Sequence, residues 1–205
     1  MLRLSEAIAE PLPDEVQLAL AHTPERLRGR VRTYFELDQR LARIVGATTE
    51  PMLGQMRLAW WRETLAKPRD ERPTGDFVLD AIGEHWAGSE EALSKLVDAW
   101  EFMLGETLDE VAARQFGKLR VAPLDTPAER WALTDAAVHV PEGVERNVLL
   151  DLAGKCSDTA SFTREVRGFA VLDALARRSL KRGGRPLMEG RGAALVAARA
   201  AILGR

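Results

Sequence analysis

The 205-residue sequence contains few residues that could cross-link the chain, bind zinc or anchor it in a membrane. Its single cysteine, Cys156, excludes an internal disulfide bond, and the three histidines form no zinc-ligand spacing with it. No apolar run approaches the roughly 20 residues that a membrane-spanning helix requires. The N-terminus, MLRLSEAIAEPLPDE, carries acids and prolines in place of a signal peptide's apolar region. We therefore predict a cytoplasmic protein in a reducing compartment.

The sequence also lacks an excess of charge of either sign. The formal net charge is −2 and the isoelectric point is near 6.0, which argues against nucleic acid as a partner because that binding depends on neutralising phosphates. The hydrophobic share of 46% is ordinary for a soluble globular protein. A chain of this length fits one domain, so we predict a single domain over residues 1–205.

Apolar residues recur at helical spacing along nearly the whole chain, and no segment alternates as a strand does. This pattern predicts an all-α fold of about eight helices. The expected helices cover residues 23–45, 51–66, 76–86, a long helix from 89 towards 116, and 127–139, 144–154, 161–181 and 190–203.

Two helix starts and one helix face carry specific expectations. We expect Thr23 to cap the first long helix, with Pro24 at its first position. In the helix after Pro51, Leu53, Met56 and Trp60 share one face, and we predict that this face packs in the core. The next residue, Trp61, projects about 100° away and should line a cavity or a partner surface.

Several isolated features have structural interpretations. Asp76 and Asp80 have a spacing that could place two carboxylates together, but they open a helix, where acidic residues interact favourably with the helix dipole. Cys156 is interpreted as a structural or incidental thiol, and the scattered histidines suggest no catalytic triad.

Four segments resemble the squalene/phytoene synthase family. They are residues 34–45 (YFELDQRLARIV), 55–65 (QMRLAWWRETL), 131–139 (WALTDAAVH) and 167–182, in the order in which the family's motifs occur. The resemblance implies a shortened isoprenoid-synthase-like helical bundle. It also implies head-to-head condensation of prenyl diphosphates, with magnesium ions in a cavity between helices neutralising the departing diphosphate.

The sequence departs from this family where its magnesium ligands would be. The family register places Ala42, Arg43 and Gly46 at the aspartates of the first motif. In the segment 131–139, it places Asp135 and His139 where the family has Asn and Asp. Methyl and guanidinium groups cannot bind Mg²⁺, so we predict a pseudoenzyme with no catalytic residue, no metal ligand and no cofactor.

Arginines on the first two motif helices form a candidate metal-free anion site, because guanidinium groups match phosphate oxygens. The alternative is that these arginines face solvent beside acidic residues. The candidate ligand-binding residues are Arg40, Arg43, Arg57, Arg62, Trp61, Asp135 and His139.

Three functional hypotheses follow. The segment EPMLGQMRLAWW is similar to the family branch that contains the mitochondrial respiratory complex I assembly factor. That similarity implies a non-catalytic assembly or lipid-handling factor, peripheral to the inner membrane, which binds a prenyl lipid or diphosphate or a protein partner.

The second hypothesis is an active prenyl transferase that uses magnesium and displaced ligands: Asp38, Asp135, His139 and Asp109 or Glu110. The third is a domain whose cavity has collapsed and which serves only in protein interaction.

Overall fold

A computed structural model describes residues 11–203 of the chain, and within this range it contains helices and no strand. The all-α prediction is therefore confirmed, and residues 11–203 form ten α-helices in place of about eight. They are α1 (Asp14–Ala21), α2 (Glu25–Gly46), α3 (Pro51–Ala66), α4 (Phe77–His85), α5 (Glu91–Glu101), α6 (Glu110–Val121), α7 (Glu129–His139), α8 (Val144–Lys155), α9 (Arg167–Leu180) and α10 (Ala193–Leu203). Short 3₁₀ segments lie at Arg69–Glu71, Phe102–Leu104, Ala122–Leu124 and Arg164–Val166.

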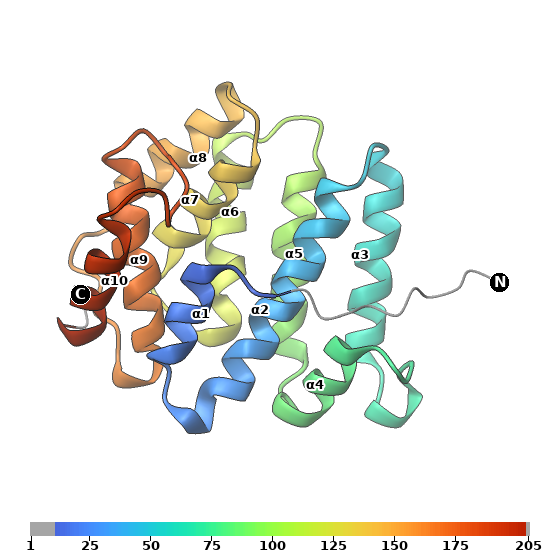
Figure 1. The fold of residues 1–205 in the computed structure, drawn as a ribbon. Helices are drawn as coiled ribbons and strands as arrows, with labels where there is room; N and C mark the ends of the chain where they lie inside the picture. The colour runs from blue at the N-terminus through green and yellow to red at the C-terminus, as the bar shows by residue number, and fades with distance from the viewer. Residues whose placement is uncertain (1–10, 204–205) are drawn as a thin grey trace.

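The helices pack in a sequence of neighbours across the molecule. Helix α3 packs on α5, α5 on α6, α6 on α7, and α7 on both α8 and α9 (Figure 1). Helix α10 packs on α9, α4 packs on α2, and α1 contacts both α9 and α2. The described residues include no helix that is long and apolar enough to cross a membrane.

Helix α2 occupies the interior because one stripe of its residues is apolar at helical spacing. Tyr34, Phe35 and Leu37 are almost completely buried. Phe35 stacks on Phe169 of α9 and makes an edge-to-face contact with Trp131 of α7, with ring centroids 5.5 and 5.6 Å apart. These aromatic contacts fix α2, α7 and α9 relative to one another.

The predicted start of α2 is wrong in detail. Pro24 stands at the N-cap, and no side chain caps the helix. The Thr23 hydroxyl instead donates a hydrogen bond to the carbonyl of Ala19 in the last turn of α1, a helix that the sequence pattern did not indicate.

The expected long helix from residue 89 towards 116 is two helices. Helix α5 ends at Glu101, and the chain passes through a 3₁₀ turn and an extended Gly105 before α6 begins. The Asp109 side chain caps α6 by accepting a hydrogen bond from Ala112 N at 2.8 Å. Val111, in the first turn of the second of these helices, is exposed.

Helix α3 buries the face opposite to the one predicted. Its core residues include Leu58, Trp61 and Leu65. Trp60 is 43% exposed and Met56 is 64% exposed, so the prediction that they pack in the core is wrong. Both faces of this helix carry large apolar residues, and the contact with α5 decides between them.

Helices α1 and α9 approach closely at Gly168. A Cβ atom at this position would lie 2.3 Å from the carbonyl oxygen of Ala19 and 2.7 Å from Oγ1 of Thr23. Only glycine permits this contact without displacing the backbone of α1. The packing places the N-terminal turn of α1, with Glu15 and Val16, beside α2 and α7.

Candidate functional site

A cavity is lined by residues of α1, α2, α5, α6 and α7, by Leu12 and Pro13 before α1, and by the loop that precedes α10. We call it the α2–α7 cavity. Its volume is about 320 Å³, near the lower limit of usual ligand sites. Its walls combine aromatic, aliphatic and charged side chains. The lining residues are Leu12, Pro13, Glu15, Val16, Phe35, Asp38, Gln39, Ala42, Trp100, Arg120, Trp131, Asp135, Val138, His139, Pro186, Leu187 and Met188.

Arg120 of α6 joins α2 and α7, the helices that contain the segments 34–45 and 131–139, at the wall of this cavity. Its Nε and Nη2 atoms donate to Oδ1 and Oδ2 of Asp38 on α2, at 3.1 and 2.7 Å. Its Nη2 also donates to Oδ2 of Asp135 on α7 at 2.7 Å. The side chains of Arg120 and Asp38 are 3% and 7% exposed. A guanidinium group thus lies between the carboxylates of the two helices that resemble the family's motif helices.

The surrounding groups hold this ion cluster in place. Nη1 of Arg120 donates to the carbonyl of Ala132 at 2.9 Å, and the indole N–H of Trp100 donates to Oδ1 of Asp38 at 2.8 Å. The guanidinium carbon lies 4.5 Å from the ring centroid of Trp131 and 5.2 Å from that of Trp100. A buried charge is stable only when it is paired and hydrogen-bonded, and Arg120 meets both conditions.

The cluster changes the pKa of its members. Burial lowers the pKa of Arg120, but the nearby carboxylates of Asp38 and Asp135 outweigh that effect and raise it above its ordinary value. Burial, reinforced by the negative charge of Asp38, raises the pKa of Tyr34 well above its usual range. Tyr34 therefore stays neutral, and its hydroxyl donates to the backbone carbonyl of Arg120 at 2.6 Å.

Glu15 contributes a third carboxylate to the cavity. Burial is the main cause that raises its pKa, and the charges of Asp135 and Asp14 add to the increase. A hydrogen bond with its own backbone and the proximity of His139 act in the opposite direction. No ion pair joins Glu15 to any residue within 11–203. Its charge is therefore less compensated than that of Asp38 or Asp135.

Two of the seven predicted site residues face the cavity. Asp135 and His139 both line it, as does Ala42 from the first motif. Asp38, which the sequence offered only as a displaced metal ligand, lines it as well. Residues of both α2 and α7 therefore line this cavity.

The four candidate arginines do not come together as an anion site. Arg40 binds Asp76 of α4, Nη1 to Oδ2 at 3.0 Å, and lies over the ring of Phe77. Arg62 binds Asp98 and Glu101 of α5. These two arginines fasten α2 to α4 and α3 to α5.

The remaining candidates are also outside the cavity. Arg57 is exposed on α3, and half-buried Arg43 donates to the carbonyl of Gln39 at 3.4 Å. Trp61 was predicted to line a cavity or a partner surface, but it is buried in the core, with its ring centroid 5.9 Å from the guanidinium carbon of Arg40. Asp76 accepts hydrogen bonds from Val78 N and Leu79 N at the start of α4, which agrees with its structural interpretation.

The carboxylates of the cavity do not fit a magnesium cluster. Among residues 11–203, no group of three or more His, Cys, Asp or Glu side chains is arranged to hold a metal ion. Asp38 and Asp135 already accept charged hydrogen bonds from Arg120. Asp109 and Glu110, the other displaced ligands considered, lie at the start of α6, where Asp109 caps the helix and Glu110 pairs with Arg114.

Sequence reasoning missed Arg120, although the sequence contains a signal for it. In α6, Arg120 follows Phe116 by four residues, so both lie on the same helix face. Phe116 is fully buried, and an arginine in the buried stripe requires a carboxylate partner within the fold. In the structure that partner is Asp38, which is buried on α2.

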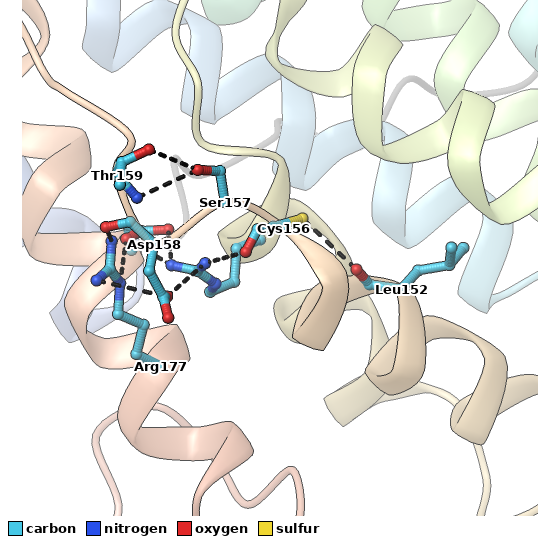
Figure 2. Close-up of polar contacts among 8 residues, drawn as sticks. Leu152, Cys156, Ser157, Asp158, Thr159 and Arg177 are labelled. Atoms are coloured by element: carbon cyan, nitrogen blue, oxygen red, sulfur yellow. Dashed lines mark hydrogen bonds and ion pairs between the residues drawn. The ribbon is translucent and has the colours of Figure 1, made fainter.

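A second arginine cluster lies at the junction of α8 and α9. Arg130 of α7 donates to both carboxylate oxygens of Asp173 at 3.2 and 3.1 Å, and to Oδ1 of Asp158 at 2.9 Å. Figure 2 shows Asp158 facing Arg177 and the Cys156 thiol directed at the Leu152 carbonyl, 3.6 Å away.

The chemistry of this second cluster is structural. Burial raises the pKa of the Cys156 thiol, and the charge of Glu129 raises it further. A thiol with a raised pKa is a poor nucleophile at neutral pH, which supports the structural interpretation of this cysteine.

Comparison with known proteins adds no relative. No protein-family model, curated protein or solved structure matches the chain. The case for a function therefore depends on the α2–α7 cavity and the residues around it.

Proposed function

We propose that this chain is a non-catalytic protein of the squalene/phytoene synthase type, which binds an isoprenoid lipid in the α2–α7 cavity without converting it. One observation carries the proposal: the guanidinium of Arg120 pairs with carboxylates on both α2 and α7. A magnesium cluster would have to displace this buried guanidinium, at a cost of several kcal/mol for each unpaired charge. Ionisation of a prenyl diphosphate by metal ions has no support in this arrangement.

The apolar part of the cavity supports lipid binding. Phe35, Trp131, Val138, Leu187 and Met188 line it beside a small number of polar groups. Ligand sites usually have this composition, with hydrophobic walls and a few polar groups that fix orientation. The volume of about 320 Å³ suits a short isoprenoid or the end of a longer chain.

Two measurements test the proposal. With farnesyl diphosphate and Mg²⁺, we expect no pyrophosphate above a protein-free control; release that stops on adding chelator would overturn the non-catalytic assignment. With farnesol, we expect thermal stabilisation of the protein. Ala42→Leu, which narrows the cavity, should reduce that stabilisation, whereas Ala47→Leu at an exposed position should preserve it. Equal responses of the two variants would place the lipid elsewhere.

A second candidate function, as an assembly factor at the inner membrane that binds another protein, is favoured by the outer face of α3. Met52, Leu53, Met56 and Trp60 are between 43% and 71% exposed on one side of this helix. Contiguous exposed apolar residues often mark an interaction site. A photo-crosslinking residue at position 56 should then give an adduct of one defined mass in cells, and one at exposed Leu195 should not. Identical adduct patterns from both positions would remove this candidate.

A further inference from the structure

The charge balance of the α2–α7 cavity indicates which head group it accepts. Glu15, Asp38 and Asp135 bring three carboxylates to its lining, and Arg120 brings the one guanidinium. The lining therefore carries more carboxylates than guanidinium groups. A cavity with this balance attracts cations and repels the phosphate groups of a prenyl diphosphate.

The hydrogen-bonding capacity of the cavity leads to the same conclusion. A guanidinium has five N–H donors, and Arg120 directs four of them to Asp38, Asp135 and the carbonyl of Ala132. A single donor remains for a ligand. Among the described residues, hydrogen bonds to Asp135 use only its Oδ2 atom, and Glu15 forms no ion pair. Acceptor oxygens are thus available in excess of donors.

The aromatic walls already interact with one cation, the guanidinium of Arg120. The face of an aromatic ring is negative and attracts positive groups within about 6 Å. The rings of Trp100 and Trp131 already hold the Arg120 guanidinium in this way, at 5.2 and 4.5 Å. The rest of the wall is apolar and suits a hydrocarbon body.

We infer that the α2–α7 cavity binds an amphiphile whose head group is a protonated amine, with the ammonium bound by Glu15 and Asp135 and the hydrocarbon against the apolar wall. This inference rests on the proposed lipid-binding function and specifies its ligand class. The ammonium supplies N–H donors to both carboxylates and neutralises part of the excess charge. Arg120 keeps its own partners and positions Asp135 without contacting the ligand.

Three probes with one tail and different heads test the inference: geranylamine, geraniol and geranyl diphosphate. Calorimetric titration at pH 7 in the presence of chelator should rank the amine first, at least tenfold tighter than the alcohol, and the diphosphate last. The Glu15→Gln variant should weaken geranylamine roughly tenfold and leave geraniol unchanged, because it removes one charge and little volume. Glu63→Gln, at an exposed position on α3, is the matched control and should behave like the unmodified protein.

The outcomes separate the two proposals. Equal affinity for amine and alcohol, or tightest binding of the diphosphate, would overturn the amine inference and leave lipid binding intact. Absence of binding by all three probes would overturn lipid binding itself. Magnesium chloride titrated alone is a fourth arm. Binding of Mg²⁺ that disappears in Glu15→Gln would assign the excess carboxylates to a metal ion and end the amine inference.

Discussion

The two buried arginine clusters use the same side chains in different surroundings. Arg120 and Arg130 are each 3% exposed, and each binds two carboxylates. Asp38 and Asp135, the partners of Arg120, lie on two helices that border a cavity. One partner of Arg130, Asp158, is 83% exposed in the segment between α8 and α9, and the carbonyl of Cys156 accepts a further bond at 2.5 Å.

This difference shows that a buried arginine does not by itself indicate a binding site. Arg130 ties the α8–α9 connection to α7 and α9, and backbone and side-chain oxygens use its donors. Arg120 leaves unpaired acceptor atoms and open space on one side, which are the two conditions for a ligand. The following predictions test the comparison.

The largest effect is expected from Arg120→Met. The variant leaves Asp38 and Asp135 in the interior without their cation, and breaking a buried pair in this way costs about 3–5 kcal/mol of unfolding free energy. Denaturant titration measures it. The triple variant Arg120→Met, Asp38→Asn, Asp135→Asn should recover most of the loss, since no unpaired charge remains. A triple variant as unstable as the single one would show that packing, and not charge, is responsible.

A smaller loss, about 2 kcal/mol, is expected from Arg130→Met. Asp158 is already hydrated, and Asp173 keeps Arg177, whose Nε lies 2.8 Å from Oδ2. The same denaturant titration compares the two variants directly. A cost equal to that of Arg120→Met would remove the distinction between an enclosed and a partly hydrated cluster.

Glu15→Gln should stabilise the ligand-free protein slightly, with a rise in Tm on the order of 1–2 °C at pH 7. The folded-state pKa of Glu15 is raised, so the folded protein binds its proton more tightly than the unfolded chain does. Its ionised form therefore lowers stability above the unfolded pKa, and this penalty disappears as the pH falls below it. Thermal scans at pH 7 and pH 4 should show the difference at the higher pH only.

The smallest effect is expected from Asp158→Asn, within about 0.5 kcal/mol, because exposed ion pairs contribute little. Its urea midpoint should coincide with that of the unmodified protein. A loss above 1 kcal/mol would mean that Asp158 acts as an enclosed partner of Arg130, like Asp38 of Arg120.

Helical spacing predicted most of the fold because it reports burial directly. The helix expected over residues 23–45 is present as α2, and its apolar residues Val31, Tyr34 and Leu37 are buried. Helical spacing predicted the wrong buried face where a helix has apolar residues on two sides. Helix α3 has apolar residues on both sides, and nothing in its own sequence states which side meets α5.

The site was harder to predict because its central interaction joins residues far apart in the sequence. Asp38 and Arg120 are separated by 82 positions. Asp135 and His139 could be found from the resemblance, since they lie on a motif helix. Glu15 could not, because α1 is short and its placement depends on the close contact between Gly168 and Ala19.

The outward face of α3 also makes the protein chemically sensitive at two sulfur atoms. Met52 and Met56 are 71% and 64% exposed, so mild peroxide should convert both to sulfoxides before it reaches partly buried Met188. Each added oxygen makes an apolar surface polar. Oxidation of these two residues, followed by mass spectrometry, would therefore report whether this side of the molecule is covered in the cell.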